Sequence, residues 1–291
     1  MTWCSICKIK RVVLILLSML CAVVYLIRRL FPRRIRVPVL VYHRTSPEDV
    51  CEEKYWNVDP RHFDQQLKYL SESTYSFISL EDLHQYIAQR AFPCERVVCI
   101  TFDDGYLDNY NYALPLIQGH EAKTSFFVST KYIGSNGPYP FLRVSRARSE
   151  QSVTPMGMHH IEEMQKHNVS FYSHGHEHTH YSDLSADQMR TEIAASLVAM
   201  DSIQQQGERL RAVAIPYGVF GDQAEVLTKI LKDMQFQCAF LGRWGSVTDE
   251  SDLLDLPRLP IYGTDSLFEF HLKVNGAYDW ISVVQKYMKN R

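Results

Sequence analysis

The sequence has no internal repeat and no low-complexity tract, which excludes repeat arrays and disordered polymers. Cysteine is scarce: seven residues scattered over a chain of 291 do not form a disulfide scaffold. Acidic residues are missing from the first 36 positions, which hold eight of the 31 Lys and Arg residues. The rest of the chain carries 23 basic and 33 acidic residues, a formal charge of −10 that argues against a nucleic-acid partner.

One long uncharged apolar run is present, from Val12 to Ile27, with basic residues on both sides. It approaches the length of about 20 residues that a membrane-spanning helix needs. Arginines follow it instead of the small residues of a signal-peptide cleavage site. We therefore predict a single-pass membrane protein with an uncleaved anchor over residues 1–36. Five basic residues after the run against three before it favour a cytoplasmic catalytic domain, and the opposite orientation stays open.

The remaining residues, 37–291, are predicted to form one catalytic domain of the α/β class. Short runs rich in Val, Ile and Phe alternate with longer helical patterns, which is typical of parallel β/α units. About seven strands of this kind predict a distorted (β/α) barrel. The expected strands are Val37–Tyr42, Ser76–Leu80, Val97–Phe102, Lys123–Val128, Val169–Ser173, Ala212–Pro216 and Gln237–Leu241.

Six helices are expected between these strands. Ser185 is predicted to cap one of them, because Gln188 three residues later completes a capping box. A long loop over residues 130–155 is predicted to be functional or mobile. The expected helices are Pro60–Ser71, Leu80–Gln89, Tyr110–Gly119, Met158–Lys166, Ser185–Gln205 and Asp222–Met234.

Polar residues with catalytic potential follow three of the expected strands. Asp103 and Asp104 end one strand, His174 ends another, and Pro216-Tyr217-Gly218 ends a third. Parallel β/α barrels build their sites at the carboxyl ends of the strands. These residues are therefore predicted to meet on one face, where carboxylates and imidazoles bind a divalent metal and accept protons.

Each motif also has a structural interpretation. Asp103-Asp104-Gly105 is a favourable turn sequence. Histidines alternate at 174, 176, 178 and 180, and such tracts also occur on surfaces. Both the 174/178 pair and the 176/180 pair have a spacing of four residues, so spacing alone does not select the ligands.

The two segments resemble the motifs of the polysaccharide deacetylase family, the NodB-like carbohydrate esterases. Thr101 to Gly105 matches the Thr-Phe-Asp-Asp-Gly motif, and Ser173-His174-Gly175 followed by His178 matches the second. The resemblance implies a NodB-like barrel in which Asp104, His174 and His178 hold a divalent metal. It also implies that Asp103 is the general base. Zinc is the leading metal, and cobalt or nickel also suits such a site.

The third family motif, Arg-x-Pro-Tyr-Gly, has Ala214 in place of its arginine. The resemblance makes Arg258, in Leu-Pro-Arg, the candidate to orient the base, with a surface arginine as the alternative. Tyr217 is implied to donate its backbone N–H to the oxyanion, with a simple turn as the alternative. The family's general acid is a histidine near the carboxyl terminus, and this sequence has no clear counterpart; His271 is a poor match. His43 is a further residue that is expected to line the site.

The sequence therefore predicts a metal-dependent hydrolase that removes N-acetyl groups from a saccharide, with O-acetyl groups as the second choice. The membrane anchor favours a cell-envelope polysaccharide or a lipid-linked sugar as substrate. A carbohydrate-binding relative with little or no turnover is one alternative, because the motif arginine and the acid are missing. An amidohydrolase-like enzyme that uses His174 and His176 as ligands is another.

Overall fold

The structure, a computed structural model, describes residue 23 and the ranges 36–47, 54–93, 96–142, 153–203 and 210–289. Nearly all of the predicted membrane anchor lies outside these ranges. Within them, no helix has both the length and the apolar character needed to cross a membrane.

The core of the fold is an eight-stranded sheet in which every pairing is parallel. Its strands run in the order β10-β1-β5-β6-β7-β8-β9, and β4 pairs with β5. No ladder joins β9 to β10 within the described ranges, so the sheet forms a half-barrel. The strands are β1 (Val39–Tyr42), β4 (Tyr75–Ile78), β5 (Arg96–Phe102), β6 (Thr124–Val128), β7 (Val169–Ser173), β8 (Ala212–Ala214), β9 (Cys238–Phe240) and β10 (Leu259–Pro260).

All seven predicted strands are present, and the distorted (β/α) barrel is confirmed as this parallel half-barrel. The eighth strand, β10, was not predicted because it contains two residues, one of them a proline. A separate small sheet pairs β2 (Arg44–Thr45) with β3 (Asn57–Val58).

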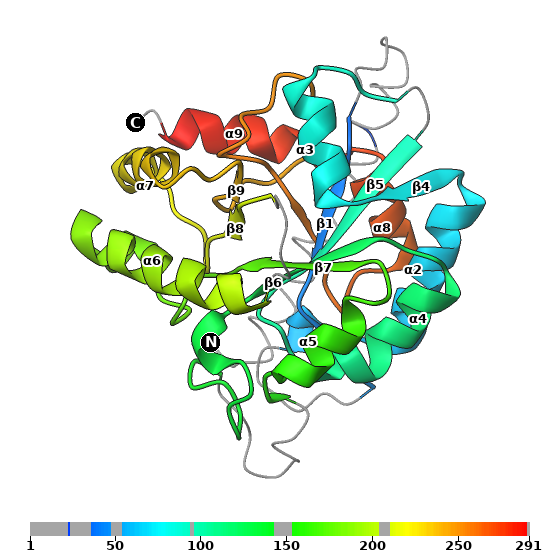
Figure 1. Ribbon diagram of the computed structural model, residues 1–291. Coiled ribbons are helices and arrows are strands. Elements are labelled where there is room, and N and C mark those ends of the chain that lie inside the picture. Colours follow the sequence, from blue (N-terminus) through cyan, green and yellow to red (C-terminus); the bar gives the residue numbers. More distant parts are fainter. Residues whose placement is uncertain are drawn as a thin grey trace, which may run out of the picture.

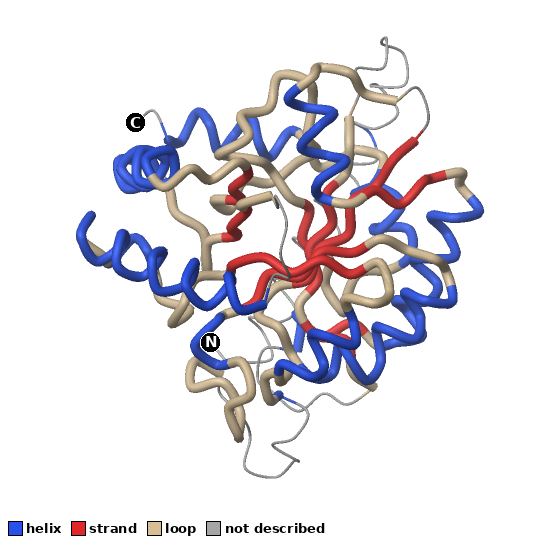
Figure 2. Tube along the Cα trace, in the orientation of Figure 1, coloured by secondary structure: helices blue, strands red, loops and turns tan. Residues whose placement is uncertain are grey.

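Helices surround the strands (Figures 1 and 2). Each predicted helix is present, although the first part of Tyr110–Gly119 is a π-helical turn, η2 (Asn109–Ala113). Ser185 and Gln188 form the predicted capping box, with N–H to side-chain oxygen distances of 2.8 and 3.3 Å. The helices are α2 (Pro60–Glu72), α3 (Leu80–Ala88), α4 (Leu114–Gly119), α5 (Met158–Met164), α6 (Ala186–Ile203), α7 (Asp222–Asp233), α8 (Leu267–Val274) and α9 (Trp280–Lys289); the short 3-10 turns are η1 (Lys54–Trp56), η3 (Thr130–Tyr132) and η5 (Tyr181–Asp183).

The strands bury both faces, as parallel strands covered by helices do. Along β5, Val98, Ile100 and Phe102 pack in one cluster with residues of α2, α4, α5 and α8. Val97 and Cys99 point to the opposite face and pack with residues of α3 and β9. The alternation continues past the end of β5, so Asp103 leaves the sheet on the Cys99 face, where the site is built.

Candidate metal centre

The two aspartates lie in the turn that follows β5. The Asp103 N–H donates to the carbonyl of Tyr42 on β1 at 2.9 Å. Asp104 and Gly105 both have positive φ, 73° and 91°. A side chain at Gly105 would place its Cβ 2.8 Å from Val128, so glycine is required at this close approach. The turn therefore presents two adjacent carboxylates in different directions.

The two histidines come from the segment after β7. The backbone N–H of His174 donates to the carbonyl of Val128 on β6 at 2.9 Å. Its Nδ1 lies 2.7 Å from the Ala214 carbonyl on β8, and in this pairing Nδ1 carries the proton and leaves Nε2 as an electron-pair donor. Glu192 of α6 accepts the N–H groups of His176 and Glu177 at 2.8 and 2.6 Å and so shapes the loop that carries His178.

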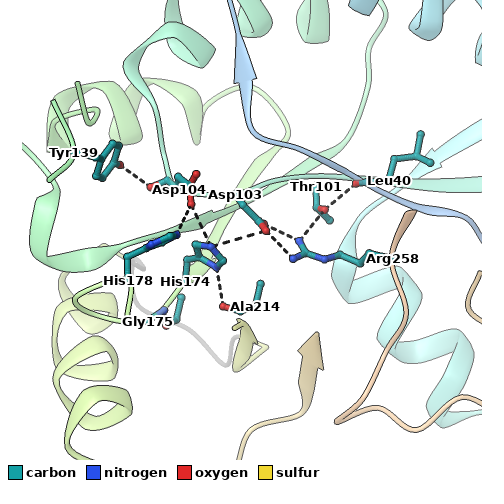
Figure 3. Close-up of polar contacts among 11 residues, drawn as sticks. Leu40, Thr101, Asp103, Asp104, Tyr139, His174, Gly175, His178, Ala214 and Arg258 are labelled. Carbon is teal, nitrogen blue, oxygen red and sulfur yellow. Dashed lines mark hydrogen bonds and ion pairs between the residues drawn. The ribbon is translucent and has the colours of Figure 1, made fainter. Parts of the chain in front are cut away.

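Asp104, His174 and His178 converge in space (Figure 3). Asp104 Oδ1 lies 3.2 Å from His174 Nε2 and 3.0 Å from His178 Nε2, and all three side chains are buried. Among the described residues, that buried Oδ1 atom has no hydrogen-bond partner. Three buried ligand atoms within 4.8 Å of one another, one of them an unsatisfied carboxylate oxygen, fit a divalent cation.

Burial by itself raises the pKa of the Asp104 carboxyl, but the imidazoles of His178 and His174 outweigh it and hold that pKa well below its usual value. Asp104 is therefore an ionised carboxylate at neutral pH. Metal binding requires this form of the ligand.

Asp103 is not one of these three ligand residues, although its Oδ2 lies 4.0 Å from His174 Nε2, and it is held by an arginine (Figure 3). Arg258 donates from Nη1 and Nη2 to the two carboxylate oxygens of Asp103, both at 2.7 Å, which is a bidentate pair. The guanidinium also packs on the rings of Phe127 and Phe240, at 5.5 and 5.0 Å from their centroids. Burial raises the pKa of Asp103, yet Arg258 and His174 bring it below its ordinary value. The structure thus places Arg258 where the missing motif arginine was expected to act.

Backbone strain is concentrated at this site. Of the described non-glycine residues with positive φ, three line the cavity: Asp104 at 73°, His178 at 55° and Tyr217 at 59°. The others follow the ends of helices, where this conformation is common, and they are Thr74, Arg90, Glu121, Asn168 and Gln235. Left-handed conformations of non-glycine residues away from such ends cluster at functional sites.

A cavity of about 240 Å³ opens over these side chains. Asp103, Asp104, His174, His178 and Arg258 all line it, so the predicted metal and base residues face one space. Aromatic side chains form much of its remaining wall, and apolar surface of this kind suits the faces of sugar rings. The cavity's aromatic residues are Trp56, Tyr106, Phe141, Tyr217, Phe240, Trp244 and Tyr262.

Tyr217 and His43 also lie at the cavity. Tyr217 is 52% exposed, and its ring stacks on His180 with the centroids 3.6 Å apart. His43 packs against Trp56 at 4.1 Å, and burial lowers the pKa of its imidazole. His43 is therefore neutral at physiological pH.

Two other histidines lie outside the site. His176 Nδ1 is 2.9 Å from Thr130 Oγ, and His176 is not part of the converging group. The geometry therefore gives no support to a His174/His176 ligand pair. His271 lies on α8, where its Nδ1 is 2.6 Å from the hydroxyl of Tyr69, and it does not line the cavity.

Sequence reasoning missed three residues that shape the site. Glu192 holds the histidine loop, Tyr139 donates its hydroxyl to the Asp104 carbonyl at 2.7 Å, and Phe141 stacks on His178. Tyr139 and Phe141 belong to the loop that was predicted to be functional or mobile. Nothing in the local pattern showed that these two residues contact the aspartate turn and His178.

A (β/α) half-barrel with a carboxylate and two imidazoles at the carboxyl edge of its sheet defines a candidate metallohydrolase. Residues 91–239, which are 149 of the 291 residues, match the family described as polysaccharide deacetylase. The chain belongs to the polysaccharide deacetylase family, and it is a deacetylase enzyme. The family and the enzyme class inferred from the motifs are thereby confirmed.

Named relatives agree with this assignment. The chain is 26% identical over 188 residues to the putative polysaccharide deacetylase YxkH of Bacillus subtilis, a match that covers 65% of this chain and 59% of that protein, less than two thirds of its length. It is 24% identical over 251 residues to the poly-beta-1,6-N-acetyl-D-glucosamine N-deacetylase of Staphylococcus epidermidis, which covers 82% and 83% of the two chains.

Solved structures share the fold. The deacetylase PplD of Streptococcus pyogenes, in complex with acetate, superposes with a TM-score of 0.68 at 24% identity, covering 83% of this chain and 99% of that one. IcaB from Ammonifex degensii gives a TM-score of 0.65 at 20% identity, covering 82% and 97%. At this level of identity the likeness shows the fold.

Proposed function

We propose that this protein is a metal-dependent N-deacetylase of a cell-envelope polysaccharide that contains N-acetylated hexosamines. The observation that carries the proposal is the convergence of Asp104, His174 and His178 next to Asp103, which Arg258 clamps. Two carboxylates in different roles are what metal-assisted hydrolysis needs, because one is consumed as a ligand and the other stays free to accept a proton.

Asp104, His174 and His178 would hold a divalent cation, which would supply a Lewis acid for the acetyl carbonyl and lower the pKa of a water molecule. We assign zinc as the leading ion, with cobalt or nickel as alternatives. Asp103 takes the proton from the attacking water, and Arg258 keeps that carboxylate ionised and oriented until it does so. Tyr217 donates its backbone N–H to the developing oxyanion. The C–N bond then breaks, and the amine leaves with the proton that Asp103 took from the water, so acetate and a free amino sugar are released.

The substrate class follows from the wall of the cavity and from the relatives. Aromatic side chains such as Trp56, Trp244 and Tyr262 offer flat faces to pyranose rings. The Staphylococcus epidermidis relative is named for poly-beta-1,6-N-acetyl-D-glucosamine. A β-linked N-acetylglucosamine polymer is therefore the proposed substrate.

A sugar carried on a membrane lipid is a second candidate. The apolar run between Val12 and Ile27 with its basic flanks supports it, since a membrane-anchored enzyme meets such substrates at the bilayer surface. Protease digestion of intact cells separates the orientations. Cleavage of the carboxyl terminus from outside would remove the argument for a cytoplasmic lipid-linked sugar.

The function is tested by acetate release from the full chain. Purified protein, stripped with a chelator, is incubated with poly-β-1,6-N-acetylglucosamine, chitin oligosaccharides and lipid-linked N-acetylated sugars, with and without Zn²⁺, Co²⁺ or Ni²⁺. We expect release only after metal is restored, and none from Asp104→Ala under the same conditions. Equal release with and without chelator would contradict the proposal.

A further inference from the structure

The two candidate histidine ligands are held in different ways. His174 is oriented by a hydrogen bond, because its Nδ1 lies 2.7 Å from the Ala214 carbonyl. His178 has no such partner within the part of the chain that the structure describes, where its buried Nδ1 makes no hydrogen bond. Imidazole ligands usually have their second nitrogen fixed in this way. Something other than a hydrogen bond must therefore set the plane of the His178 ring.

Aromatic rings enclose His178 instead. The ring of Phe141 is stacked on the imidazole, with centroids 3.8 Å apart and planes within 15° of parallel. The ring of Tyr217 meets it edge to face at 4.8 Å and 73°. The side chain of His178 is left 7% exposed. Rotation about its Cβ–Cγ bond would drive the imidazole into one of these rings, so the pair restricts that rotation.

Phe141 also contacts Asp104 indirectly, through Tyr139. Its ring packs on Tyr139, with centroids 4.8 Å apart. The Tyr139 hydroxyl donates to the backbone carbonyl of Asp104 at 2.7 Å. Phe141 therefore contacts His178 with its own ring and is linked through Tyr139 to the backbone of Asp104, so one short segment contacts two of the three converging residues.

We propose that Phe141 is a positioning residue that fixes the imidazole plane of His178 by stacking and so holds Nε2 among the three converging ligand atoms. This inference rests on the proposed role of His178 as a metal ligand. The stack replaces the hydrogen bond that orients His174. Without the Phe141 ring the imidazole can rotate. Metal binding then has to order it, and the lost conformational entropy weakens the affinity for the metal.

The test compares metal affinity in full-chain variants at position 141. Phe141→Leu and Phe141→Met keep an apolar side chain without a ring, and Phe141→Tyr keeps the ring. We expect the Zn²⁺ dissociation constant, measured by competition with a chromophoric chelator, to rise about tenfold in the Leu and Met variants and less than about threefold in Phe141→Tyr. Phe268→Leu, at a residue 61% exposed on α8, is the matched control and should leave the constant unchanged.

Spectroscopy separates positioning from a general loss of structure. The visible absorption of bound Co²⁺ should change in the Leu and Met variants and be retained in Phe141→Tyr, while thermal unfolding of the metal-free proteins stays close to the wild type. Wild-type affinity and a wild-type spectrum in both the Leu and the Met variant would overturn the role of Phe141 and leave the proposed metal site standing. If the wild type binds no metal, or His178→Ala binds it as tightly, the proposed site falls and the inference falls with it.

Discussion

Two buried arginine–aspartate pairs lie near the same cavity, and they differ in geometry. In the first, Arg258 donates two hydrogen bonds of 2.7 Å to the two oxygens of Asp103, and the guanidinium side chain is 11% exposed. In the second, Arg44 Nε donates to Asp108 Oδ2 at 2.9 Å, and both side chains are at most 1% exposed. Asp103 faces the cavity, whereas Asp108 does not line it.

The difference appears in the pKa values of the two carboxyls. Burial raises both, but at Asp103 the bidentate arginine and His174 prevail and the pKa falls below its usual value. At Asp108 burial prevails over Arg44, and the pKa rises to about 7. Asp108 also accepts the backbone N–H of Thr45 at 3.3 Å, which ties β2 to the start of η2. The first pair therefore keeps an ionised carboxylate at the cavity, and the second holds chain segments together.

Replacement of the base should give the largest effect. Asp103→Asn keeps the shape of the side chain but removes the proton acceptor, so we expect kcat/KM for acetate release to fall by about 10³-fold. Bound metal should stay at the wild-type level, because Asp103 is outside the converging group. Retention of more than a tenth of the activity would contradict the role of Asp103.

Removal of the carboxylate from the Arg44–Asp108 pair should lower the stability of the fold. Asp108→Ala removes the buried carboxylate that accepts from Arg44 Nε at 2.9 Å, and the loss of this buried ion pair costs about 3 kcal/mol in the free energy of unfolding. Urea denaturation measures this loss. The double variant Arg44→Met/Asp108→Leu should recover most of it, since both charges of this pair are then replaced by apolar side chains. A double variant as unstable as the single one would argue against an electrostatic cause.

A smaller change separates orientation from charge at the first pair. Arg258→Lys keeps the positive charge but loses the two-pronged contact with Asp103, so we expect about a tenfold fall in kcat/KM. The base works in its ionised form, and activity is lost as pH falls through its pKa. Because the lysine lowers that pKa less, the acidic limb of the kcat/KM profile should move to higher pH. An unmoved limb would show that Arg258 does not set the pKa of Asp103.

Within a single pH unit, the smallest expected effect is a slope in stability from Asp108. Its folded pKa of about 7 lies above the ordinary value of 3.8, so between these values the folded state binds more protons than the unfolded state. Stability from this group is therefore present at low pH and lost as pH rises toward 7. The difference in unfolding free energy between wild type and Asp108→Asn should shrink by about 1 kcal/mol per pH unit from pH 5 to 7. A constant difference would contradict the raised pKa.

The sheet was predictable because buried parallel strands consist of short runs rich in Val, Ile and Phe, as in β5 and β6. Two helices were missed near the carboxyl terminus. For α8 a signal exists, since Ser266 and Glu269 form a capping box just before an apolar run. β10 carries no signal of its own, because its register is set by pairing with β1.

Site residues in the motifs were predictable from their family resemblance, and Arg258 from a Leu-Pro-Arg segment far along the chain. The supporting residues were not. Glu192 lies on a helix, where a glutamate side chain is usually solvated. Here the carboxylate is buried and accepts hydrogen bonds from two N–H groups of the histidine loop. Phe141 lies in a loop without periodicity. Such contacts depend on the tertiary fold and leave no local pattern.

The central claim, that Asp104, His174 and His178 hold a metal beside Asp103, is tested most directly by metal titration. Full-chain wild type, His176→Ala and His178→Ala are stripped and titrated with Zn²⁺, and bound ion is counted per chain. We predict one tightly bound ion in the wild type and in His176→Ala, and none in His178→Ala. Tight binding that survives in His178→Ala but is lost in His176→Ala would contradict the account and move the site to the other histidine.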